Sequence, residues 1–157
     1  MTDGSQIIRL FDKASESLKW PHFTFHLDDG SKIKFKRLSN KTRYPGSIII
    51  TNGKSFGHPD QRILGYIHLN GSVILNEMPD QLEIQIWLII TDPVEKIAIN
   101  GMRYNHCCFC GIELTDRRSV EHGYGPICAE KWGLPWDNVA LTVEDENALL
   151  KSIRQKD

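Results

Sequence analysis

Residues 107–128 read CCFCGIELTDRRSVEHGYGPIC, and this stretch holds every cysteine of the chain, namely Cys107, Cys108, Cys110 and Cys128. Cys107 and Cys110 form a C-x2-C pair, in which two sulfurs on one tight turn can reach the same ion. Gly111 follows directly, where a positive φ lets backbone N–H groups point at the sulfurs. Because soft thiolates bind zinc strongly, the pair predicts half of a structural zinc site.

The second half of the predicted site surrounds Cys128. Pro126 suits the first position of a helix, and Gly133 can end that helix one or two turns later. Cys128 therefore lies in the first turn of a short helix. A knuckle, then a turn or hairpin, then a ligand at a helix start is the layout of a treble-clef zinc module.

The fourth zinc ligand is less well determined by the sequence. His122 is chemically the best candidate, Asp116 is second, and water could fill an open position. His106 and Cys108 adjoin Cys107, and neighbouring residues rarely reach one ion with good geometry. We therefore interpret Cys108 as a small buried hydrophobic residue. The predicted cofactor is a structural Zn²⁺ ion, with the proposed ligands Cys107, Cys110, Cys128 and His122.

Residues 107–129 follow the pattern C-x2-C-G-x2-L-T-D-x2-S-x3-G-Y-G-P-x-C-A. This pattern resembles a family of small domains of unknown function, regarded as zinc-binding, in bacteriophage and mobile-element proteins, sometimes beside helicase-type domains. A looser resemblance extends to Tyr44-Pro45-Gly46-Ser47, to the Asp92-Pro93 helix start and to Gly133-Leu134-Pro135-Trp136. The resemblance implies a zinc module and a phage or prophage setting. It implies no reaction, and it does not fix a histidine at position 122.

The composition is that of an ordinary globular protein. The 157 residues are 40 % hydrophobic and 25 % charged, with a formal net charge of −1, so nucleic-acid binding would need a local basic patch. The clustered cysteines and the absence of a visible export signal favour a metal site in the cytoplasm of a bacterial host over disulfides. No membrane association is expected. We predict an α+β core domain at 1–104 and a zinc-binding module at 105–157.

The fold class is predicted as α+β, with a small antiparallel sheet, flanking helices and the treble-clef-like zinc module. Apolar residues at helical spacing predict a helix over 5–19, with Ser5 as its cap and Pro21 as its stop. Alternating residues and turn sequences then predict hairpins and short buried segments. The expected strands, about five in number, are 22–27, 32–36, 47–51, 62–67 and 72–75.

Residues 80–91 fit both a strand and a helix, and their length and the capping residue Asp80 favour a helix. A second helix is predicted to begin after Asp92, with Pro93 at its first position and Glu95 in a capping box. Gly101 is expected to end it. A last helix is predicted over 143–155, capped by Thr142.

A local basic strip lies between Ser31 and Ser47, where the chain carries no acidic residue. Alternation places Lys32, Lys34 and Lys36 on one face of a strand, as in sheets that hold single-stranded nucleic acid. Lysines on an exposed strand face also prevent aggregation, so both interpretations stay open. The proposed nucleic-acid-binding residues are Lys32, Lys34, Lys36, Arg37, Lys41, Arg43 and Tyr44, the last as a stacking partner.

No P-loop, nucleophile elbow or H-E-x-x-H motif is present in the sequence. The main hypothesis is a non-enzymatic, zinc-stabilised protein that binds a host or phage protein, for example as an inhibitor of a host enzyme or defence system. The alternative is binding of single-stranded nucleic acid through residues 32–43. A metal-dependent nuclease or hydrolase is the remote alternative, because the helix at 126–132 lacks the histidine that HNH nucleases place there.

Overall fold

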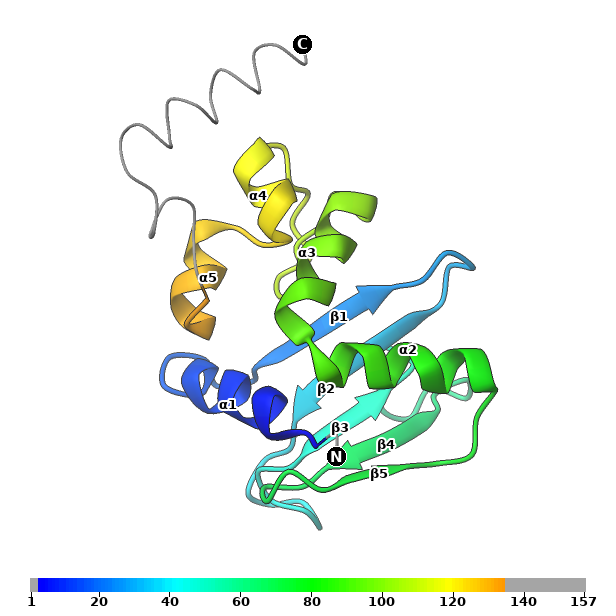
Figure 1. Cartoon of the computed structure of the whole chain (residues 1–157). Helices are drawn as coiled ribbons and strands as arrows, with labels where there is room; N and C mark the ends of the chain where they lie inside the picture. Colours follow the sequence, from blue (N-terminus) through cyan, green and yellow to red (C-terminus); the bar gives the residue numbers. More distant parts are fainter. Residues whose placement is uncertain (1–2, 135–157) are drawn as a thin grey trace.

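The computed structural model describes residues 3–134 as a five-stranded antiparallel sheet with helices on one of its faces (Figure 1). The strands follow one another in space in the order of the sequence, from β1 to β5. Both the α+β class and the predicted strands are confirmed. The strands are β1 (His22–His26), β2 (Lys32–Arg37), β3 (Ile48–Thr51), β4 (Ile63–Ile67) and β5 (Val73–Leu75).

The alternation of the sequence sets the two faces of the sheet. Phe23 pairs with Phe35 across β1 and β2, and Phe35 pairs with Ile50 of β3, so these apolar side chains share one face. All three are fully buried. The intervening polar residues of β1 and β2 lie on the opposite face, because successive side chains alternate across a strand.

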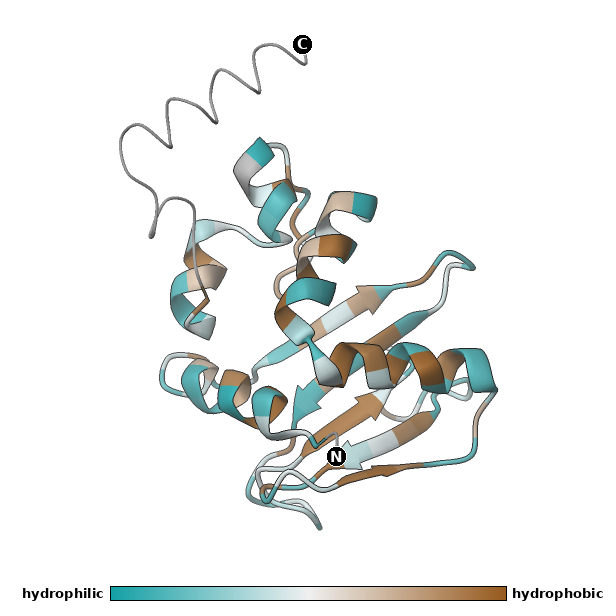
Figure 2. Cartoon of the chain, in the orientation of Figure 1, coloured by the Kyte–Doolittle hydropathy of each residue, from teal (hydrophilic) through white to brown (hydrophobic). Residues whose placement is uncertain are grey.

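The helices are α1 (Ser5–Ala14), α2 (Asp80–Thr91), α3 (Pro93–Tyr104), α4 (Arg117–His122) and α5 (Pro126–Trp132). α1 and α2 cover the apolar face of the sheet (Figure 1). Figure 2 shows that α2 is hydrophobic over much of its length. Its residues Ile86, Ile89 and Ile90 are buried against the core, so the ambiguous segment 80–91 is a helix.

The first helix is shorter than predicted and begins differently. It ends at Ala14, because the backbone N–H groups of Ser17 and Leu18 both donate to the Ala14 carbonyl and close a turn. This turn places Leu18 against the core. Ser5 does not cap the helix; its backbone N–H and hydroxyl instead donate to Asp3 Oδ1.

Two expected helix boundaries are also wrong. Asp80 is the first residue of α2 and makes no capping bond, since Pro79 occupies the capping position. Gly101 does not end α3, which continues to Tyr104 and stops where Asn105 takes a left-handed conformation with φ 56°. The start of α3 is as predicted, because the Asp92 side chain accepts a hydrogen bond from the Glu95 N–H at 3.2 Å.

One hydrophobic core joins the sheet to the cysteine-rich segment. The ring of Phe23 lies 5.7 Å from that of Phe109 and 5.6 Å from that of Trp132. Phe109 and Trp132 stack on each other at 4.5 Å. The core thus contains residues from both sides of the predicted boundary at 104/105, and the boundary itself stays a prediction.

The predicted helix over 143–155 lies outside the described residues. Within residues 3–134, no helix has the length and apolar character needed to cross a membrane.

Candidate functional site

The backbone around Cys107 forms a compact knuckle. The Cys107 N–H donates to the Ile112 carbonyl at 2.9 Å, and the Gly111 N–H donates to the Cys107 carbonyl at 2.9 Å. Gly111 takes the predicted positive φ, at 75°. A short pairing between His106 and Glu113 closes the knuckle. These bonds form because glycine tolerates the left-handed turn that returns the chain on itself.

The structure brings together the sulfur atoms of Cys107, Cys110 and Cys128, which all lie within 4.8 Å of one another. Sulfurs bound to one tetrahedral zinc ion at about 2.3 Å would lie roughly 3.8 Å apart, so the donor set fits such an ion with small side-chain adjustments. All three are free cysteines. Cys128 stands in α5, which begins at Pro126 and ends before Gly133, as predicted. Metal binding by these three residues is therefore chemically possible, and the identity of the metal belongs to the proposal below.

The pKa values of the three neighbouring thiols shift in different directions. A hydrogen bond from the Cys128 thiol lowers the pKa of Cys107 to about 5, which favours the thiolate form of Cys107. The same hydrogen bond raises the pKa of Cys128, while burial raises that of Cys110. A divalent cation between the sulfurs would replace the shared protons, because metal binding requires deprotonated thiols.

Cys108 faces away from this group and is buried, as predicted. Burial raises its pKa, and its thiol donates to Asn100 Oδ1 at 3.7 Å. The Cys108 carbonyl also accepts a hydrogen bond from the Thr24 N–H at 2.7 Å. Asn100 bonds both the N–H and the carbonyl of His26 with its side-chain amide. The knuckle and α3 therefore satisfy the free edge of β1, which would otherwise be open to pairing with another chain.

His122 and Asp116 do not join the cysteine group in the described part of the chain. His122 is the last residue of α4, and its ring lies 5.6 Å from that of Tyr124. The fourth ligand thus stays a prediction. The helix α4 itself was missed, because a turn or hairpin was expected there. Asp116, a residue type favoured at helix caps, directly precedes it and could have indicated it.

Comparison with known proteins gives one match. Residues 100–133 match the model of the "Family of unknown function (DUF6011)". The match begins inside α3 and ends at the glycine after α5, so it contains the whole cysteine group. No curated protein and no solved structure matches the chain. The resemblance to DUF6011 thus concerns the cysteine-rich segment and names no activity.

The face of the sheet opposite the helices is basic. Lys32, Lys34 and Lys36 lie there as predicted, opposite His26, Thr24 and His22 of β1. No strand of the sheet contains an aspartate or a glutamate. Among the described residues, none of the three lysines takes part in an ion pair. We call these six residues the lysine face.

Burial and neighbouring positive charge both lower pKa values on this face. Burial lowers the pKa of Lys34, and the neighbouring charge of Lys36 lowers it further. Burial also lowers the pKa of His26, with smaller contributions from Lys32 and His106. Positive charge is therefore crowded here without a compensating carboxylate.

A cluster of three rings adjoins the lysine face. Lys36 pairs with Ile49 of β3, and Ile49 pairs with Tyr66 of β4, so the three share one face. The ring of Tyr44 lies 5.2 Å from that of Tyr66 and 5.2 Å from that of His68. The sequence analysis found Tyr44 but missed Tyr66 and His68. Their alternation in residues 62–68 could have placed them on the outer face.

The remaining predicted basic residues divide between two locations. Arg43 lies 5.5 Å above the Tyr44 ring, and Lys41 is exposed in the same loop. Arg37 instead lies on the helix-covered face, where it pairs with Asp12 at 2.7 Å and donates to the Gly46 carbonyl. Side chains alternate along β2, so Arg37, two residues after Phe35, lies on the same face of the sheet as Phe35. Arg37 is thus separated from the three lysines.

Proposed function

We propose that this protein is a non-enzymatic, zinc-stabilised protein that binds single-stranded nucleic acid on its lysine face. The observation that carries the proposal is the set of Lys32, Lys34 and Lys36 on a sheet surface without carboxylates, beside the ring cluster. The proposal includes a phage or mobile-element setting, which the resemblance of residues 107–129 implies. Inhibition of a host protein and hydrolysis stay predictions without a structural observation that favours them.

In the proposed binding mode, the lysine face contacts the phosphates and the ring cluster contacts the bases. The lysines alternate along β2, so their attachment points are about 7 Å apart and can contact successive phosphates of an extended strand. Tyr44, Tyr66 and His68 supply rings on which bases can stack, an interaction that tolerates any base. Recognition of this kind is independent of sequence and depends on salt.

The proposed role of zinc is structural. Cys107, Cys110 and Cys128 would hold the ion, with His122 as the first candidate for the fourth ligand, in a treble-clef arrangement. The ion would fix the knuckle whose Cys108 carbonyl bonds to Thr24 of the lysine face. Phe109, inside the knuckle, packs beneath β1 against Phe23. Zinc would thus support the nucleic-acid surface without touching it.

Replacement of Lys32, Lys34 and Lys36 by glutamine should weaken binding to single-stranded DNA. Each lost phosphate contact removes roughly 0.7 from the slope of log affinity against log salt concentration, so the slope should fall by about 2. Fluorescence anisotropy with labelled oligothymidylate at several salt concentrations measures both quantities. None of the three lysines belongs to the hydrophobic core, so the melting temperature should change little.

The matched control replaces Lys13, Lys19 and Lys131 by glutamine, which changes the net charge equally but leaves the lysine face intact. This control should bind like the unmodified protein. Equal weakening in both variants would show a general charge effect, and absence of binding to any single-stranded DNA or RNA would reject the proposal.

A further inference from the structure

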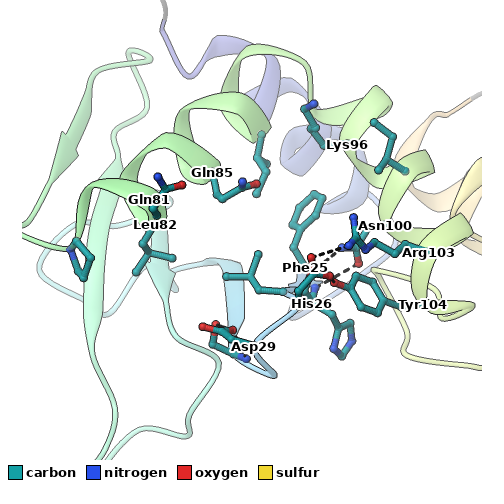
Figure 3. Close-up of a pocket in the computed structure, with 16 residues that line it drawn as sticks. Phe25, His26, Asp29, Gln81, Leu82, Gln85, Lys96, Asn100, Arg103 and Tyr104 are labelled. Carbon is teal, nitrogen blue, oxygen red and sulfur yellow. Dashed lines mark hydrogen bonds and ion pairs between the residues drawn. The ribbon is translucent and has the colours of Figure 1, made fainter.

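A concave surface lies on the helix-covered side of the sheet, away from the three lysines of β2. It is a cavity of about 630 Å³ between the β1–β2 turn, α2 and α3 (Figure 3). Small-molecule sites in proteins commonly have volumes of roughly 300–1,000 Å³. None of the three cysteines of the sulfur group and none of the three lysines of β2 contributes to its lining, whereas His26 of the lysine face does.

The floor of the cavity is apolar. Phe25 and Ile89 belong to the core, and Leu82 packs partly against it. Ile99 also lines the cavity, with 41 % of its surface exposed. Binding of an apolar or planar group would be favoured here, because it would cover the apolar surface of this floor.

Two helices supply polar groups to opposite walls. Gln81 and Gln85 are one turn apart on α2 and therefore share a face. Lys96 and Arg103 are two turns apart on α3 and likewise share a face. Figure 3 shows the two glutamines on one helix and the two cations with Asn100 on the other.

Some of the charged side chains that line the cavity already have hydrogen-bond or ion-pair partners in the part of the chain that the structure describes, and others do not. Asp28 receives hydrogen bonds from Arg103, at 2.6 Å, and from the Tyr104 hydroxyl. Asp29 accepts from the Ser31 backbone and hydroxyl. Lys96, in contrast, has no ion pair within the described residues. The end of the cavity at Lys96 is therefore the place for an anionic group.

We propose that this cavity binds a nucleotide through its base and its phosphate. The base would lie on the apolar floor, and its edge would face Gln81 and Gln85, whose amides each offer a donor and an acceptor. The phosphate would contact the Lys96 ammonium. This site can be tested separately from the proposed strand-binding surface, because none of the three lysines of that surface lines the cavity.

Isothermal titration of the full chain with the four nucleoside 5′-monophosphates tests the proposal. Binding of at least one is expected, and Lys96→Gln should weaken it about tenfold, as should removal of the phosphate from the ligand. Gln85→Leu should weaken nucleotide and nucleoside alike, since it removes a contact to the base. Comparison of 5′-phosphorylated with 5′-hydroxyl oligonucleotides shows whether the nucleotide is free or the end of a strand.

The controls separate this site from the lysine face. The variant with Lys32, Lys34 and Lys36 replaced by glutamine should bind the monophosphate as the unmodified protein does. Lys131→Gln, on α5, should also have no effect. Failure of all four monophosphates to bind at millimolar concentration, or binding that survives both cavity substitutions, would overturn the proposal without affecting the test of strand binding.

Discussion

Replacement of Cys110 by serine is expected to abolish zinc binding and to destabilise the cysteine-rich segment severely. Structural zinc contributes on the order of 10 kcal/mol to the folding of small zinc modules, and serine is a poor ligand for this ion. Cys110 is exposed, so the substitution leaves no cavity in the core. We expect zinc to fall from about one ion per chain to near zero, with a melting temperature lower by at least roughly 10 °C.

Elemental analysis and thermal melting of the purified protein measure these quantities. The matched control is Cys108→Ala, a cysteine of the same knuckle that lies outside the sulfur group. This control should retain a full equivalent of zinc and lose only the stability that comes from a small buried side chain and its hydrogen bond to Asn100. A Cys110→Ser protein that keeps its zinc and its melting temperature would exclude Cys110 as a ligand of the proposed metal centre.

Replacement of Gly101 by alanine is expected to destabilise the protein, although alanine favours helices over glycine by about 1 kcal/mol. A Cβ atom at Gly101 would lie 2.0 Å from the Cα atom of Gly123, in the backbone between α4 and α5. Both residues are buried. The helix and the cysteine-rich segment would have to separate, at a cost of about 1–3 kcal/mol or more. The melting temperature should fall by on the order of 5 °C.

The control is Gly57→Ala, where a Cβ atom would meet nothing within 4 Å. Its φ of 87° makes alanine strained, so a loss of about 1–2 kcal/mol is expected from conformation alone. Chemical denaturation of the three proteins compares these losses. An unchanged or increased stability of Gly101→Ala would show that α3 and Gly123 are not in such close contact.

The prediction that Gly101 ends α3 shows why sequence-based reasoning failed at some positions. Glycine often ends a helix, and the pattern around residue 101 allowed that interpretation. The actual reason for glycine is contact with Gly123, a residue of a different segment that no local pattern could associate with it. The early end of α1 has a similar origin, since Leu18 turns back to pack on the core.

The correct predictions concern neighbours along the chain. Cys107 and Cys110 are held together by one tight turn, and the Asp92 side chain reaches an N–H three residues away. The β1–β2 hairpin followed from alternation around a turn between His26 and Lys32. In each case the backbone geometry of a few residues fixes the arrangement, so the sequence contains the information locally.

By itself, the sequence determined the three cysteines that come together, the lysines on one face of β2 and the two hairpins of the sheet. Only the tertiary structure decided that Tyr66 and His68 join Tyr44, that Arg37 is held by Asp12, and that a cavity lies between the β1–β2 turn, α2 and α3. The physical reason is that local spacing follows from backbone geometry, whereas contacts between distant segments depend on how all the apolar faces pack together.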